Sequence, residues 1–211
     1  MSVQGLADHF GTLLEKTISA KPIKLQGQKI RDKEAPDWLI GNYAPDRDKL
    51  PTIEPIELKN GGFLRFEHRV RVLDDPGTER NINKTTTLSY SYEYSATSPD
   101  DPDWILRYEY ETEPQDPKAR YPAGHLHVNA EPRDYTQIEK VKNFPLLHLP
   151  TSRLSIEKII WHLANEHTPR ARKAEKQEWF ELLNESEKGH REGTQRKDNY
   201  RKTSVNATSH S

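Results

Sequence analysis

The residues that decide the fold are two segments with a two-residue period, Trp104–Glu111 (WILRYEYE) and His125–Asn129 (HLHVN). Alternate residues of a strand face the same side of a sheet, so hydrophobic and ionisable side chains separate in each segment. In the first segment the hydrophobic face is predicted to hold Trp104, Leu106, Tyr108 and Tyr110. We predict that the two segments pair as a β-hairpin. If Leu126 and Val128 face the same core as the hydrophobic residues of the first arm, the opposite, open face collects four ionisable side chains: Arg107, Glu109, His125 and His127.

Two earlier segments show the same period and predict half-buried strands. In Phe63–Leu73 hydrophobic residues alternate with charged ones, and in Thr85–Tyr94 Leu88 and three tyrosines alternate with smaller polar residues and a glutamate. His68 falls on the hydrophobic side of its strand, and we interpret it as a hydrogen-bonded core histidine rather than a ligand. The tyrosines favour packing between strands, with base stacking as the alternative interpretation.

Helical periodicity appears in the sequence both before and after these predicted strands. Hydrophobic residues recur every three or four positions from Val3 to Ile18 after a possible N-cap at Ser2. Ser155 precedes a second stripe, which runs to His167, and a third, strongly charged helix is expected over residues 170–188. Residues 23–56 contain four prolines and few hydrophobic clusters, so we expect an irregular segment there.

The elements together predict an α+β fold. We expect a meandering antiparallel sheet of about four strands, with the N-terminal helix and the C-terminal helices packed on one face. Residues 1–168 should form a single domain, in which residues 23–56 are irregular and rich in proline. Residues 169–188 should form a charged helix, and residues 189–211 a disordered polar tail.

The composition excludes several function classes. Charged residues make up 31% of the 211 residues and hydrophobic residues 32%, with a net charge of −1, so any contact with nucleic acid must be local. The chain has no cysteine, which excludes disulfides and thiolate metal sites and suits a reducing compartment. We expect a cytoplasmic protein, because the first residues lack a signal-peptide pattern and no hydrophobic run approaches the ~20 residues of a membrane span.

The ionisable face of the hairpin contains the groups that cleave RNA without a metal. This reaction needs a base for the 2′-hydroxyl, an acid for the leaving 5′-oxygen and a cation beside the phosphorane. Histidine can serve as base or acid, glutamate as base, and arginine holds two phosphate oxygens at once. We therefore predict a catalytic site without metal or cofactor, formed by His125, His127, Glu109 and Arg107. The predicted substrate-binding residues are Tyr108, Tyr110 and Asn129.

Two other interpretations of the same residues stay open. Two histidines separated by one residue lie about 6.5–7 Å apart along a strand, a spacing that also occurs in metal sites. The nearby Arg107 would oppose a cation, and no aspartate follows the pair as in many zinc hydrolases. Arginine, glutamate and histidine also alternate on ordinary solvated strand faces, where they form ion pairs between strands.

The order of these motifs resembles that of the TumE-type proteins of bacterial toxin–antitoxin pairs. Those proteins carry R-Y-D-N, a loop rich in histidine and proline, and H-K-H before a terminal helix. This chain has R-Y-E-Y, a proline-containing loop, H-L-H-V and a helix from S-I-E-K-I-I, over roughly residues 105–163. Arg107, Tyr108, His125 and His127 match, whereas Glu109 replaces aspartate and Tyr110 replaces asparagine. The resemblance implies a prokaryotic or phage-borne cytoplasmic protein that is toxin-like and encoded with a partner.

Two functions from different classes are therefore expected. The first is a toxin-like, metal-independent endoribonuclease of a toxin–antitoxin or antiphage-defence locus, with RNA as substrate and a neutralising partner protein. The second is a non-enzymatic interaction module of a defence operon, which binds another protein through the sheet and the 170–188 helix. Neither involves a membrane, and the sequence does not indicate an oligomeric state.

Overall fold

The computed structural model describes residues 1–31, 36–43, 52–73, 84–96, 104–112, 123–129, 148–166 and 174–189. The chain divides into two compact units, Met1–Leu154 and Ser155–Ser211. The first unit begins with helix α1 (Val3–Lys16). Its strands are β1 (Gln26–Arg31), β2 (Asp37–Gly41), β3 (Ile56–Glu57), β4 (Phe63–Leu73), β5 (Lys84–Ser95), β6 (Leu106–Glu111), β7 (Gly124–Val128) and β8 (His148–Thr151).

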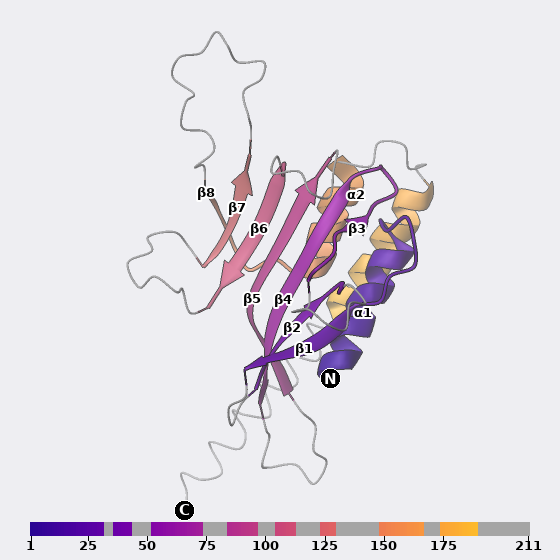
Figure 1. Cartoon of the computed structure of the whole chain (residues 1–211). Helices are drawn as coiled ribbons and strands as arrows, with labels where there is room; N and C mark the ends of the chain where they lie inside the picture. The colour runs from indigo at the N-terminus through magenta and orange to yellow at the C-terminus, as the bar shows by residue number, and fades with distance from the viewer. Residues whose placement is uncertain are drawn as a thin grey trace, which may run out of the picture. The chain divides into compact units, whose positions relative to one another are not determined.

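In the described part of the first unit, eight antiparallel strands form one open sheet (Figure 1). The strand order is β1-β2-β4-β5-β6-β7-β8, and the short strand β3 also pairs with β4. The predicted α+β class with an antiparallel sheet is confirmed. The expected number of about four strands was too low, because β1, β2 and β8 extend the sheet at both ends.

The additional strands lie where hydrophobic alternation is weak. β1 and β2 fall inside residues 23–56, so the expectation of an irregular segment was wrong for that part of it. β1 reads QGQKIR and has few hydrophobic residues, which suits its place at the end of the sheet, where β2 is its partner among the described strands. β8 lies at the other end and contains Pro150, which an edge strand can accommodate because it needs no N–H donor on its outer side.

The register aligns hydrophobic side chains into rows across the sheet. One row runs from Leu64 through Tyr94 and Leu106 to Val128. The next row runs from Phe66 through Tyr92 and Tyr108 to Leu126, and Phe66 stacks on Tyr92 with ring centroids 4.7 Å apart. The tyrosines of β5 are buried at Tyr90, Tyr92 and Tyr94. They therefore pack in the core and do not form an exposed platform for base stacking.

Helix α1 covers the hydrophobic face beside β1 and β2 (Figure 1). The Ser2 hydroxyl accepts a hydrogen bond from the Gly5 N–H at 3.1 Å, which confirms the predicted N-cap. Phe10 of the helix packs against Phe66 and His68, with ring centroids 5.8 Å and 5.0 Å away. The predicted N-terminal helix is thus confirmed, and it fixes which face of the sheet is buried.

The second unit contains helix α2 (Ile156–Glu166) and a further helix over residues 174–189. Ser155 caps α2, because its hydroxyl accepts from the Lys158 N–H at 3.4 Å. The two helices contact each other through the rings of Trp161 and Phe180, whose centroids lie 5.0 Å apart. Both predicted helices are confirmed over the described residues, whereas their packing on the sheet and the boundary at residue 168 stay predictions. Within the described residues, no helix has the length and hydrophobicity to cross a membrane.

Some expectations concern residues outside the described ranges. They include the proline-containing loop between the arms of the hairpin, the start of the third helix at residues 170–173 and the polar tail after Gly189. The predicted disorder of that tail therefore stays a prediction.

Candidate functional site

The site begins with the pairing of β6 and β7. Arg107 lies opposite His127, and Glu109 lies opposite His125, in an antiparallel register. The intervening residues of β7 belong to the hydrophobic rows of the other face. The predicted hairpin is therefore confirmed, and the period-two alternation is what brings the four ionisable side chains to one face.

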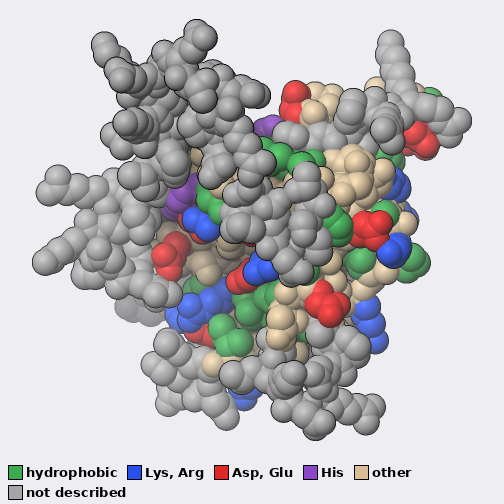
Figure 2. All heavy atoms as spheres, turned by 45° about the horizontal axis from the view of Figure 1, so that its top comes forward, with side chains coloured by type: hydrophobic (Ala, Val, Ile, Leu, Met, Phe, Trp, Pro, Cys, Tyr) green, Lys and Arg blue, Asp and Glu red, His purple; other side chains and the backbone are tan. Residues whose placement is uncertain are grey.

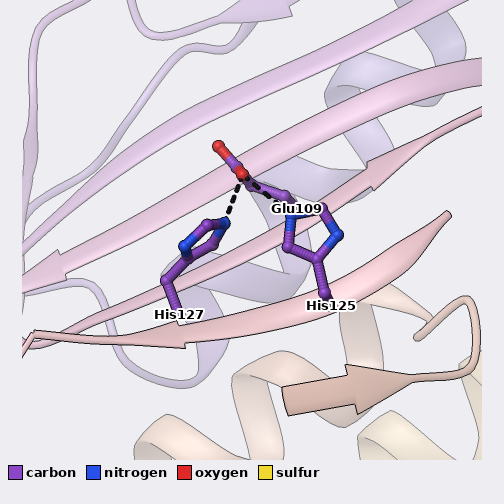
Figure 3. A group of neighbouring side chains, drawn as sticks. All are labelled: Glu109, His125 and His127. Carbon is purple, nitrogen blue, oxygen red and sulfur yellow. Dashed lines mark hydrogen bonds and ion pairs between the residues drawn. The ribbon is translucent and has the colours of Figure 1, made fainter. Parts of the chain in front are cut away.

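The two imidazole rings converge on one carboxylate oxygen (Figure 3). The Oε2 atom of Glu109 lies 2.7 Å from the Nε2 atom of His127 and 3.2 Å from the Nε2 atom of His125. The centroids of the two rings are 4.7 Å apart. A neutral ring that donates from Nε2 keeps Nδ1 as its acceptor, so these hydrogen bonds select the tautomer of both histidines.

Arg107 holds the other oxygen of the same carboxylate. Its Nε atom lies 3.0 Å from Oε1 of Glu109, and its guanidinium also reaches Glu93 at 3.8 Å. The guanidinium carbon is 4.7 Å from the centroid of the Trp104 ring. Glu109 therefore has one oxygen in an ion pair with the guanidinium and the other oxygen beside the imidazoles; within the described residues the Nε atom of Arg107 makes no hydrogen bond, so the contact is electrostatic.

The histidines are more buried than an open face implies. His125 is 4% exposed and His127 is 7% exposed, whereas the side chains of Arg107 and Glu109 are each 29% exposed. The expectation of an open surface was thus wrong for the two imidazoles. The physical reason is their packing: each ring lies against the other and against Glu109, and His127 also meets Trp104 edge-on at 6.2 Å between centroids.

Trp104 is a site residue that alternation placed on the wrong face. The pattern grouped it with Leu106 and Tyr108 on the hydrophobic side, but β6 begins at Leu106, so the alternation does not extend back to Trp104. Its ring instead contacts Arg107 and His127. No signal in the sequence separates the two placements, because the start of a strand is poorly marked.

A hollow of about 460 Å³ lies beside the cluster and reaches across the sheet from β2 to β7. Its lining includes Glu67, Arg69, Ser89, Ser91, Glu109, Glu111 and His125. Burial raises the pKa of Glu67. Figure 2 shows acidic, basic and histidine side chains mixed together on the viewed surface. The sequence could not reveal this hollow, because it depends on the register of five strands.

The three residues predicted to bind substrate do not join the cluster. Tyr108 is buried among the hydrophobic rows on the opposite face, where burial raises its pKa. Tyr110 stacks on Tyr90 with ring centroids 5.4 Å apart, and the guanidinium carbon of Arg153 lies 5.4 Å from the centroid of the Tyr110 ring. Tyr110 also borders the hollow. Asn129 follows β7, and its backbone N–H donates to the Ile105 carbonyl at 3.0 Å.

The cluster of Glu109, His125 and His127 can support two kinds of chemistry. The imidazoles and the carboxylate are within proton-transfer distance of one another. The same three groups offer one potential metal-ligand atom each, all within 4.8 Å of one another. Comparisons of the chain with protein-family models, with curated proteins and with solved structures found no match.

Proposed function

We propose that the protein is a toxin-like, metal-independent endoribonuclease that is encoded with a neutralising partner. One observation carries the proposal: two histidine nitrogens converge on a single glutamate oxygen, and an arginine holds the other oxygen. Paired acid–base groups beside a guanidinium are the requirement for phosphodiester cleavage through the 2′-hydroxyl. The resemblance to TumE-type proteins in the order of these residues supports the toxin-like part of the proposal.

The surroundings of each residue suggest its role. His125 borders the hollow, so it is the imidazole that meets the 2′-hydroxyl or the leaving oxygen. Glu109 sets the tautomer of His125 and stabilises the positive charge that develops on the imidazole ring when it takes up a proton. His127 makes the shorter bond to Glu109 and packs against Trp104, which suits a group that positions the carboxylate. Arg107 is partly exposed beside them and supplies positive charge for the phosphorane.

The charges around the hollow limit how RNA can bind. The lining has three glutamates, Glu67, Glu109 and Glu111, against one arginine, Arg69. A long stretch of phosphates would be repelled there, whereas one phosphate beside Arg107 gains a favourable partner. The lining also offers hydrogen-bonding groups, namely the hydroxyls of Ser89 and Ser91 and the glutamate carboxylates. These groups can form hydrogen bonds with the ribose hydroxyls and the base edges of RNA. We therefore expect cleavage within a short, unpaired segment of RNA.

The test is incubation of the purified protein with total RNA, with and without a chelator. We expect cleavage that the chelator does not reduce and that His125→Ala slows by roughly 10²–10⁴-fold. Glu54→Gln is the control, because Glu54 is exposed and is not among the described residues that line the hollow. Loss of cleavage on chelation, or intact RNA at high protein concentration, would contradict the proposal. Intact RNA would favour the alternative of a non-enzymatic interaction module.

A further inference from the structure

We infer that Glu109, His125 and His127 also form a binding site for a divalent transition metal such as Zn²⁺, and that the bound ion inhibits RNA cleavage. The binding half of the inference stands on the geometry of the cluster alone. The inhibitory half rests on the proposed function.

The ligand types and distances suit zinc. Two imidazoles and one carboxylate, with an open fourth position, are a recurring ligand set for this ion. Donor atoms of a tetrahedral zinc site lie about 3.3 Å apart. Here Oε2 of Glu109 is 3.2 Å from one Nε2 atom and 2.7 Å from the other. All three donor atoms lie within 4.8 Å of one another, so the widest pair must approach by up to about 1.5 Å to reach the tetrahedral spacing given by the usual Zn–N and Zn–O lengths.

The chain holds these ligands in place before a metal arrives. Both imidazoles come from one strand and are buried, so little side-chain freedom is left to lose on binding. Arg107 contacts Oε1 of Glu109, which leaves Oε2 directed at the two rings. Partners of this kind orient the ligands of metal sites and increase affinity. On binding, the proton that each neutral ring carries on Nε2 is exchanged through solvent to Nδ1, so that the lone pair of Nε2 is available to the metal.

The electrostatic surroundings also favour a cation. The hollow beside His125 contains the carboxylates of Glu67 and Glu111 in addition to Glu109. The positive charge of Arg107 is shared between Glu109 and Glu93, which reduces its repulsion of an incoming ion. The hollow also offers a route by which an ion and its fourth ligand, water, can approach His125.

Metal binding and metal-free cleavage use the same two side chains. Once the ion holds Nε2 of His125 and Oε2 of Glu109, the proton of the ring lies on Nδ1, so His125 cannot act as a base, and Glu109 no longer stabilises the charged ring. We therefore expect Zn²⁺ to inhibit cleavage over the same concentration range in which it binds.

The test is calorimetric titration of the full chain with Zn²⁺ after removal of metals, together with Co²⁺ titration followed by visible absorption. We expect one bound ion per chain and the absorption bands of tetrahedral cobalt. Glu109→Gln and His125→Ala should each weaken binding by more than roughly 100-fold, because loss of a ligand exceeds the loss of an outer partner. Glu54→Gln and His162→Ala should bind Zn²⁺ as the unaltered chain does, because neither residue is among the described residues of the cluster or of the hollow. Circular dichroism checks the fold of each variant, and Glu109→Gln retains the size of the side chain.

The outcomes separate the two proposals. Absence of binding to the folded chain, or unchanged affinity in Glu109→Gln, would overturn the metal site. Binding without any RNA cleavage would leave the metal site standing and remove the proposed function. Cleavage that Zn²⁺ does not inhibit would overturn the inhibitory half, and cleavage that Zn²⁺ activates would also overturn the metal-independent mechanism.

Discussion

Among the described residues, three buried histidines lie on the two faces of one sheet, and they have different partners. His68 lies on the hydrophobic face, where its ring nitrogens bond to the hydroxyls of Tyr92 and Thr87 at 2.5 Å and 3.0 Å. His125 and His127 lie on the other face and share a carboxylate oxygen of Glu109. The comparison shows that burial alone does not identify a functional histidine. The partner does: a hydroxyl satisfies a neutral ring, whereas a carboxylate can stabilise the charged ring that catalysis requires.

The pKa of His68 agrees with a structural role. Burial and, to a smaller extent, the positive charge of Arg153 lower the pKa of His68 to about 3. The ring therefore stays neutral near pH 7 and fills the core beside Phe10. The interpretation of His68 as a core histidine, made from alternation in its strand, is confirmed.

The largest effect should come from removing the imidazole that borders the hollow. His125→Ala should reduce the rate of RNA cleavage by roughly 10²–10⁴-fold, the usual contribution of a general acid or base. Because His125 is buried, the variant should also lose some stability, so thermal melting must accompany the rate measurement. A folded His125→Ala variant that retains full activity would remove His125 from the mechanism.

His68→Ala should lower the stability of the fold and leave the rate of RNA cleavage unchanged. It leaves a cavity and removes hydrogen bonds from Tyr92 and Thr87, so the free energy of unfolding should fall by about 2–3 kcal/mol. The cleavage rate per folded molecule should not change. Denaturant unfolding and cleavage assays on the same sample test both parts, with His162→Ala as the control. A large loss of cleavage activity in folded His68→Ala protein would contradict the assignment of a structural role to the hydrophobic face and a catalytic role to the other face.

Arg107→Lys should reduce cleavage by about tenfold. Lysine keeps the positive charge but loses the planar guanidinium that can hold two phosphate oxygens, so the transition state should suffer more than substrate binding. The measurement is kcat and KM separately, with a larger change expected in kcat. A change confined to KM would show that Arg107 only attracts substrate.

A smaller effect should appear in the pH dependence of stability. The pKa of His68 is lower in the folded chain than its ordinary value of 6.5, so protons bind preferentially to the unfolded chain below pH 6.5. The contribution of His68 is therefore complete above pH 6.5 and is lost as pH falls towards 3. The slope for one group is at most about 1.4 kcal/mol per pH unit. Denaturant unfolding from pH 7 to pH 4.5 should show a flatter dependence for His68→Ala, and identical slopes would contradict a neutral core histidine.

The sequence predicted the hairpin and the meeting of its ionisable residues because both arms alternate without interruption. It did not predict β1, which is polar at the edge of the sheet, or β8, which contains a proline. It placed Trp104 on the wrong face because alternation does not mark where a strand begins. The burial of His125 and His127, and the hollow beside them, depend on side-chain packing and on a register across several strands, which local patterns do not contain.

The central claim is that Glu109 and His125 act as one catalytic unit, and a double-mutant cycle on single-turnover RNA cleavage tests it most directly. The variants are Glu109→Gln, His125→Ala and the combination, with Glu54→Gln in place of Glu109→Gln as the control cycle. We predict that the combined variant loses about as much activity as His125→Ala alone, because groups that act together are not additive. Losses that multiply as independent effects in folded protein would contradict the claim, as would a chain that does not cleave RNA at all.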